Sequence, residues 1–166
     1  MQELELGKTI VHPTHGTGKV KEIKEVCVMG EPTTYYVLDF GASDVGKVMI
    51  PLDKVQAIGL RNPVTPEVLQ ETIDYLESPE VEVQSKRSNF HRIHKEYTER
   101  IAKGCIFEIA KVYKALSKKG LEKELGLKDK LLFEKTETML VGEIGASYQI
   151  TIQESKTKLT SALNIN

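Results

Sequence analysis

The spacing of apolar residues changes near Arg61-Asn62-Pro63, and this change limits the possible folds more than any other feature. Before it, short runs rich in Val, Ile and Tyr are bounded by Gly and Pro, which is typical of antiparallel strands. After it, apolar residues recur at helical spacing, which is typical of amphipathic helices. The sequence therefore predicts an α+β chain with two domains, a β domain over residues 1–62 and a compact all-α helical domain over residues 63–166.

The first domain contains five candidate strands, at residues 9–12, 19–28, 34–40, 45–50 and 56–60. Two segments of turn-forming residues, at 29–32 and 41–44, separate three of them. Short antiparallel strands in a segment of this length favour a small closed sheet. We expect a small SH3-like or Tudor-like β-barrel.

The second domain begins with Thr65-Pro66-Glu67, a strong helix start with an N-cap residue, a proline at the first helical position and an early acid. Further helices are expected at about 88–103, before Gly104, and at about 105–119 and 128–148. Residues 152–163 form either a last short helix or a frayed end.

The composition limits where such a chain can act. The sequence has 166 residues, 40% of them apolar, without a run of the roughly 18 apolar residues that a membrane span needs. The short, acidic start differs from a signal peptide. Cys27 and Cys105 are isolated and are expected to be reduced thiols in the core. We expect a cytoplasmic protein.

The formal net charge of −1 conceals a basic block. Residues 84–130 carry 13 Lys and Arg against 6 Asp and Glu, a local net charge of +7, whereas residues 64–83 carry six acids and no base. A basic block indicates an anionic partner, and a nucleic acid is the natural candidate. The alternative, given equal weight on composition, is a solvated helix surface.

The sequence gives no support for an enzyme, a metal site or a cofactor. The run Gly16-Thr17-Gly18-Lys19 superficially resembles a phosphate-binding loop, but Pro13 and Val20 occupy positions that need Gly and Ser or Thr. Two histidine pairs, 12/15 and 91/94, lack the cysteines or acids that would complete a zinc site. We expect no catalytic residues and no metal ligands.

The run VHPTHGTGKV at residues 11–20, followed by Ile50-Pro51 and Gly59-Leu60-Arg61, resembles the amino-terminal module of the CarD/CdnL family of bacterial transcription regulators. Transcription-repair coupling factor shares this module. The resemblance extends into the second half through Ser88-Asn89-aromatic-x-Arg92 and the glycine at 104. It implies a regulator that binds RNA polymerase and contacts promoter DNA.

In the second domain, the resemblance implies a DNA contact at Phe90. Family members carry a tryptophan there, which enters the minor groove at the upstream edge of the melted promoter, while nearby basic residues hold the DNA backbone. Arg92 and Lys95 match such positions, and Arg87 is a further candidate. Phe90 also shares a helical stripe with Ile93, Tyr97 and Ile101, so the pattern alone favours a core position.

In the first domain, the resemblance implies a contact with the β subunit of RNA polymerase, made largely by pairing of sheet edges. The matching strand is 47–51, where alternation directs Lys47, Met49 and Pro51 outward and leaves Val48 and Ile50 for the core. Phe40 could extend this surface. Some relatives carry arginines on this face, at positions where this chain has Val26 and Met49. The expected contact is therefore more apolar in this chain.

The implied function is stabilisation of the promoter open complex, through DNA contacts that do not read sequence. We expect a monomer when free, located at the nucleoid through RNA polymerase. Two other functions fit the same sequence. One is a free-standing DNA-binding or architectural protein, which the near-neutral charge disfavours. The other is an adaptor whose helical domain binds another protein.

Overall fold

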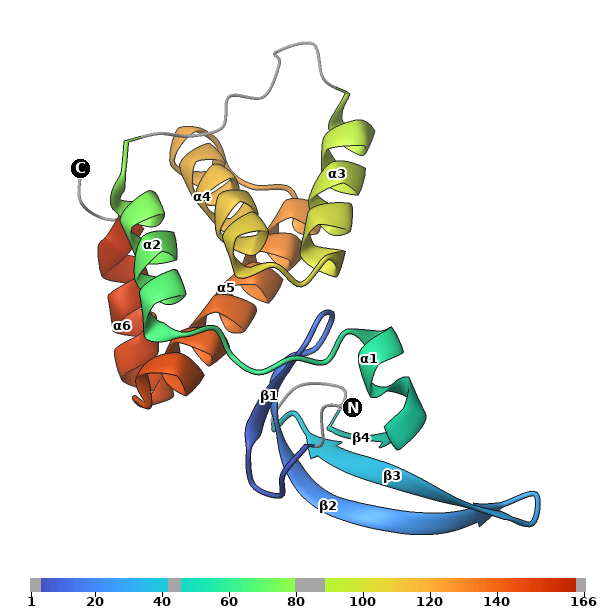
Figure 1. The fold of residues 1–166 in the computed structure, drawn as a ribbon. Helices are drawn as coiled ribbons and strands as arrows, with labels where there is room; N and C mark the ends of the chain where they lie inside the picture. Colours follow the sequence, from blue (N-terminus) through green and yellow to red (C-terminus); the bar gives the residue numbers. More distant parts are fainter. Residues whose placement is uncertain (1–3, 42–45, 80–88, 164–166) are drawn as a thin grey trace. The chain divides into compact units, whose positions relative to one another are not determined.

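The computed structural model describes residues 4–41, 46–79 and 89–163 (Figure 1). The chain forms two compact units, Met1–Pro63 and Val64–Asn166, and each is described by itself. The first is a sheet with a short helical segment, and the second consists of helices. This arrangement confirms the α+β class. Among the described helices, none has both the length and the apolar character needed to cross a membrane.

The first unit is built on a four-stranded antiparallel sheet with the order β1-β2-β3-β4. Its strands are β1 (Thr9–His12), β2 (Gly16–Val28), β3 (Glu31–Asp39) and β4 (Lys47–Pro51). Figure 1 shows that β2 and β3 extend together as a long hairpin well beyond the two short strands. A bulge between Val20 and Glu22 interrupts their pairing, where the ribbon bends.

One face of the sheet is covered by the short helical segment that follows β4. The core side chains there include Ile10, Val20, Leu38, Ile50 and Val55. They come from all four strands and from the short helix α1 (Val55–Ile58), which follows the 3₁₀ turn η1 (Leu52–Lys54). Alternation along β4 buries Ile50 and half-buries Val48, as the sequence predicted.

Two details of the predicted barrel are wrong. Residues 56–60 form the end of α1 instead of a fifth strand, because Gly59 adopts a left-handed conformation (φ 82°) that closes a single helical turn. After this turn, Arg61 forms an isolated bridge with Val11 of β1, through two backbone hydrogen bonds of 2.8 and 3.1 Å. Among the described residues no strand joins β1 to β4, so the sheet stays open.

The glycine-rich run at residues 16–18 serves packing within this unit. A Cβ atom on Gly18 would lie 2.7 Å from the Phe40 ring, a separation at which the ring would have to move. Gly16 has a φ of 75°, which favours glycine. His12 holds the turn between β1 and β2, because its Nδ1 accepts the N–H groups of Thr14 at 3.1 Å and His15 at 3.3 Å. These contacts account for the run without any phosphate ligand.

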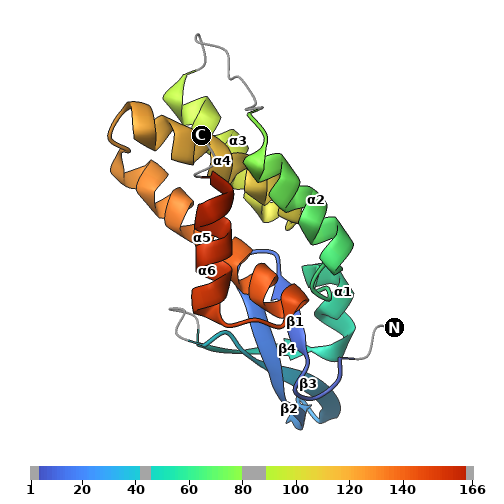
Figure 2. The ribbon, with the colours of Figure 1, turned by 90° about the vertical axis from the view of Figure 1, so that its left-hand side faces the viewer.

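The second unit contains five helices in its described part: α2 (Pro66–Glu77), α3 (Phe90–Ala102), α4 (Ile106–Glu122), α5 (Leu127–Tyr148) and α6 (Ile152–Leu163). Helix α5 packs against α4 and α6, and α2 packs against α4 and α6 (Figures 1 and 2). The predicted helices are all present. Helix α4 runs through Gly120, one turn beyond its predicted end, and the tail is helical.

The core of this unit is built from apolar residues at helical spacing on all five helices. Its fully buried members include Leu69, Ile101, Ile109, Val112, Leu116, Leu140, Ile144 and Leu159. The expectation for the cysteines is wrong, since Cys27 and Cys105 are both exposed. Cys105 is the N-cap residue of α4, outside the helix that was expected to bury it. Cys27 lies in the part of the hairpin that extends past the core.

Candidate functional site

The first turn of α3 presents an aromatic side chain to solvent. Asn89 is the N-cap residue, and its Oδ1 accepts the N–H of His91 at 3.2 Å. Phe90 follows and is 42% exposed, whereas Tyr97 and Ile101 further along the helix are buried. The apolar stripe therefore begins at Ile93, and Phe90 is not part of the core. A ring in this position can contact a partner.

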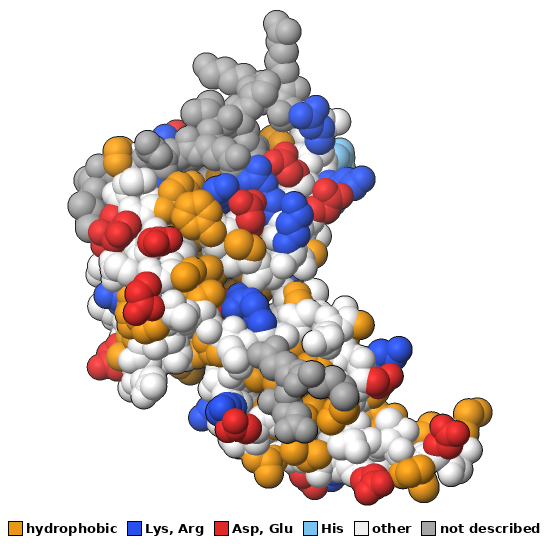
Figure 3. Space-filling view, in the orientation of Figure 1, with side chains coloured by type: hydrophobic (Ala, Val, Ile, Leu, Met, Phe, Trp, Pro, Cys, Tyr) orange, Lys and Arg blue, Asp and Glu red, His pale blue; other side chains and the backbone are white. Residues whose placement is uncertain are grey.

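Basic side chains lie on the same helix as this ring. Arg92 and Lys95 are exposed on α3, and Lys95 makes a long ion pair of 3.9 Å with Glu99. Figure 3 shows Lys and Arg side chains gathered over α3, with acids among them. The positive end of the α3 helix dipole adds positive potential at this end of the helix. Arg87, the fourth predicted DNA-binding residue, lies outside the described residues.

Helix α4 adds a cation that sequence reasoning did not assign to the site. Lys119 places its Nζ 5.4 Å from the centroid of the Phe90 ring, a cation–π distance. The signal was present in the sequence, because two helices joined by a tight turn at Gly104 run antiparallel. The last turn of α4 then lies beside the first turn of α3.

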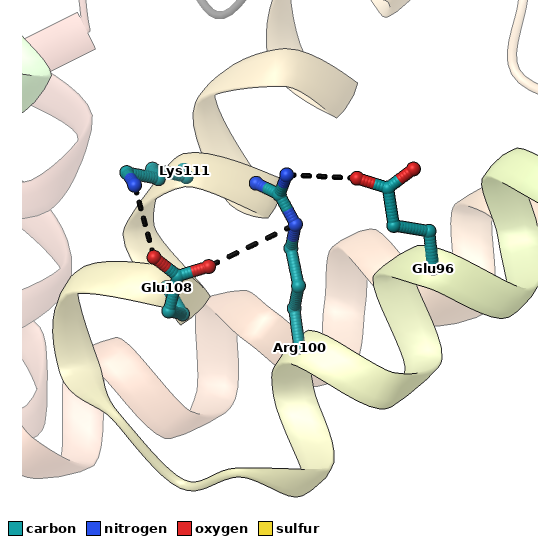
Figure 4. Close-up of polar contacts among 4 residues, drawn as sticks. All are labelled: Glu96, Arg100, Glu108 and Lys111. Atoms are coloured by element: carbon teal, nitrogen blue, oxygen red, sulfur yellow. Dashed lines mark hydrogen bonds and ion pairs between the residues drawn. The ribbon is translucent and has the colours of Figure 1, made fainter.

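Other basic residues of the block at 84–130 form ion pairs with acidic side chains. Figure 4 shows Arg100 donating to Glu96 at 2.7 Å and lying 3.7 Å from Glu108, which also pairs with Lys111 at 2.9 Å. Glu96 and Arg100 belong to α3, while Glu108 and Lys111 belong to α4. The four charges cancel and join the two helices. These pairs take Arg100 and Lys111 out of the set of cations that could bind an anionic partner.

The first unit offers a different kind of surface at β4, the last strand of the sheet. The Phe40 N–H donates to the Gly46 carbonyl at 3.0 Å, and Asp39 lies opposite Lys47. In an antiparallel pair this alternation directs the backbone groups of Lys47 and Met49 away from β3. No described strand pairs with that outer edge. The edge can therefore accept a further strand.

The side chains beside this edge are largely apolar. Met49 is 49% exposed, Lys47 is exposed and Pro51 is half-buried. Cross-strand register places Val37 opposite Met49 and Tyr35 opposite Pro51 on the same outer face. Val26 lies on that face of β2, opposite Thr33. The edge thus adjoins a mixed face, on which Met49, Tyr35 and Val26 lie among charged side chains such as Glu22 and Lys24 of β2.

One predicted contact residue is placed elsewhere. Phe40 is buried, and its ring packs edge-on against His12 with a centroid distance of 5.8 Å. Its ring also fills the space left by the missing side chain of Gly18. Phe40 therefore supports the sheet from inside and cannot extend the exposed surface.

His12, at the turn between β1 and β2, also has a structural role. Burial, with a smaller contribution from the nearby charge of His15, lowers the pKa of His12 from 6.5 to about 4. Its Nδ1 is an acceptor in three hydrogen bonds, so this nitrogen is committed to the turn. Within the described residues, no group of three or more His, Cys, Asp or Glu is placed to hold a metal ion.

Comparison with known proteins identifies both halves of the chain. Residues 4–64 match a family model described as CarD-like/TRCF RID domain, and residues 71–160 match one described as CarD, C-terminal domain. The chain belongs to the CarD family. It is also 29% identical over 157 residues to a Bacillus subtilis (strain 168) protein named "Putative transcription factor YdeB". That alignment covers 92% of this chain and 97% of the relative.

Membership of the CarD family makes the chain an RNA-polymerase-binding transcription regulator and not an enzyme. This agrees with the resemblance found in the sequence and with the absence of a predicted catalytic site. The two family models divide the chain between a sheet and a helical unit. Each unit contains one of the two surfaces described above, the β4 edge in the first and the Phe90 surface in the second.

Proposed function

We propose that this CarD-family chain stabilises the promoter open complex by binding DNA and RNA polymerase at the same time. The β4 edge of the first unit pairs with a strand of the polymerase β subunit. The first turn of α3 then contacts the DNA at the upstream edge of the melted bubble. The protein acts in the cytoplasm, as a monomer held at promoters by polymerase.

The observation that carries this proposal is the exposure of Phe90 at the start of α3, with the Lys119 ammonium over its ring and Arg92 exposed two residues along the helix. An apolar side chain flanked by cations is the arrangement that minor-groove proteins use to open a base step while holding the phosphates. Phenylalanine can enter and stack, although it lacks the N–H group that a tryptophan would donate. Phosphate contacts of this kind place the protein without reading sequence.

The mechanism is a difference in binding between two promoter states. A base step at the edge of the bubble is already partly unstacked in the open complex, so entry of the ring costs less there than in the closed complex. Contacts that form better with the open state shift the equilibrium toward it. Coupling of this type is typically worth about 1–3 kcal/mol.

Support for the polymerase contact comes from the backbone of β4. Edge pairing supplies main-chain hydrogen bonds, and neighbouring side chains provide selectivity. Lys47 and Met49 turn their N–H groups toward the open edge, and Pro51, which has no N–H, ends the strand. The apolar outer face beside Met49 favours a polymerase surface with apolar side chains next to the paired strand.

The test is the lifetime of the open complex formed by the cognate polymerase, with Phe90→Ala and Met49→Ala compared with wild type. Removal of the Phe90 ring should cost about 1–2 kcal/mol, a five- to thirtyfold loss of the lifetime gain. Phe107→Ala and Met29→Ala are matched controls, since both side chains are exposed but lie away from the two surfaces. Equal effects of Phe90→Ala and Phe107→Ala would contradict the DNA contact.

A second variant of the same strand separates backbone pairing from side-chain contact. Met49→Pro removes an N–H that points to the open edge and leaves the hydrogen bonds to β3 in place. Polymerase binding should fall further than with Met49→Ala while the sheet stays folded. Undiminished polymerase binding by a folded Met49→Pro variant would favour the adaptor function, with a different polymerase or protein contact.

A further inference from the structure

Lys119 is held by a buried acid on a neighbouring helix. Its Nζ lies 2.6 Å from Oδ2 of Asp129, in the first turn of α5, and the Asp129 side chain is only 4% exposed. A buried carboxylate needs a partner, because an unpaired charge in the interior is costly. The lysine side chain, itself partly exposed, is therefore more restrained than a lysine that reaches freely into solvent.

The same ammonium group, from α4, lies over the Phe90 ring of α3. The other ring contacts of Phe90 are with His91 and His94, at centroid distances of 5.9 and 6.3 Å, and both belong to α3 itself. Contacts within the first turns of α3 move with that helix. Lys119 is different, because Asp129 connects it to α5.

We propose that Lys119, held by Asp129, is a positioning residue that sets the orientation of the Phe90 ring for its contact with DNA. This inference rests on the proposed DNA contact of Phe90 and adds the residues that prepare it. The cation attracts the face of the ring and limits its rotation at an exposed helix start. A ring that is already oriented loses less conformational freedom when it enters a base step.

The chain has no tryptophan, so Phe90→Trp introduces a single fluorescent reporter at the position in question. In that background, Lys119→Met keeps the length of the side chain and removes its charge. Time-resolved anisotropy of the full chain should show faster local motion of residue 90. Asp129→Asn should have the same effect in smaller degree, and Lys119→Arg should restore the slower motion.

Lys158→Met is the matched control, since Lys158 also places its ammonium over an aromatic ring, 5.1 Å from the centroid of Tyr148. It should leave the anisotropy of residue 90 unchanged. With Phe90 restored, Lys119→Met should shorten the open-complex lifetime at least threefold and Lys158→Met should not. A role of Lys119 in folding alone would change unfolding without changing the anisotropy of the folded state.

Two results would separate this inference from the proposed function. If the anisotropy of residue 90 is unchanged by Lys119→Met in a folded chain, the positioning role is wrong, whatever Phe90 does on DNA. If the anisotropy changes but Phe90→Ala leaves the open-complex lifetime intact, the positioning contact stands and the DNA contact is wrong. Should Lys119→Met fail to fold, Asp129→Asn, which keeps the volume of the acid, provides the same comparison.

Discussion

His12 illustrates how a single side chain can hold the first unit together. Its Nδ1 accepts the N–H of Thr14, the hydroxyl of Thr14 and the N–H of His15. A protonated imidazole has a hydrogen on this nitrogen and cannot accept any of them. The turn between β1 and β2 therefore depends on the neutral form of His12, in agreement with a pKa lowered by burial to about 4.

The first prediction concerns the pH dependence of this turn. Between pH 6.5 and about pH 4 the unfolded chain binds a proton at His12 more readily than the folded chain does, so stability falls as the pH is lowered. After allowance for solvent near the ring, we expect a loss of about 1–2 kcal/mol by pH 5. Urea unfolding followed through the NMR signals of β1 and β2 measures it.

His12→Asn is the control, because an asparagine oxygen can accept the same N–H groups and does not titrate. This variant is expected to be less stable at pH 7, where the contact of the imidazole with Phe40 is missing. Its stability should nevertheless change less between pH 7 and pH 5 than that of wild type. The same pH dependence in both proteins would show that His12 is not responsible.

For single residues, the sequence predicted the chemistry of a segment better than it predicted whether a side chain is buried or exposed. The exclusion of a phosphate loop agrees with Gly18, whose missing side chain makes room for Phe40. The same contact buries Phe40, and no local pattern reveals it, since Gly18 lies in β2 and Phe40 follows the end of β3. Phe90 shows the opposite case. Its place on the apolar stripe predicted burial, but a stripe does not show where the neighbouring helices end.

At the scale of elements, boundaries depend on contacts that are distant in sequence. Val, Ala, Ile and Leu at residues 55–60 satisfy a strand pattern, yet the left-handed Gly59 and the pairing of Arg61 with Val11 produce one helical turn instead. Helix α4 passes through Gly120, where an added Cβ atom would lie 3.5 Å from the Leu125 side chain. The ends of α3, α4 and α5 were predicted to within three residues.

The second prediction concerns the buried end of α2. Lys114 of α4 is buried and donates to the carbonyl oxygens of Tyr75 and Ser78 at the carboxyl end of α2. Lys114→Met removes this cation from the helix end and takes a charged donor away from both carbonyl groups. We expect a loss of about 2–3 kcal/mol in the free energy of unfolding of the helical unit.

Lys118→Met is the comparison for this measurement, since Lys118 lies one turn along α4 and is exposed. Its loss should change the free energy of unfolding by about 0.5 kcal/mol or less. Thermal unfolding followed by far-UV circular dichroism detects the difference. A small effect of Lys114→Met would mean that water replaces the ammonium and that α2 and α4 are held by apolar contacts alone.

At the scale of the whole molecule, the two units are joined by a very short connection. Arg61 is bound to Val11 by two backbone hydrogen bonds in the first unit. Val64 donates its N–H to the buried Glu143 at 3.1 Å in the second. Only Asn62 and Pro63 lie between these anchored residues, and proline restricts both its own backbone and that of Asn62. The connection between the two anchored residues is therefore only two residues long.

In the proposed function this short connection matters, because the proposed contact with DNA is small. The net charge is −1, and several cations of the helical unit are paired with acids. Under that proposal, binding to polymerase through the first unit adds affinity by keeping the second unit at high local concentration near the DNA. The gain depends on the length of the linker more than on any single contact in either unit.

The last prediction follows from this dependence. Insertion of a flexible Gly/Ser segment of about 20 residues between Asn62 and Pro63 reduces the local concentration to the millimolar range or below. We expect polymerase binding to persist and the gain in open-complex lifetime to fall about tenfold, whereas the same segment added after Asn166 should change neither. If the insertion leaves the lifetime intact, the helical unit finds its DNA site without the help of a short linker. Its own affinity for DNA would then have to be far higher than the charge distribution indicates, which direct titration of promoter duplex at low salt would reveal.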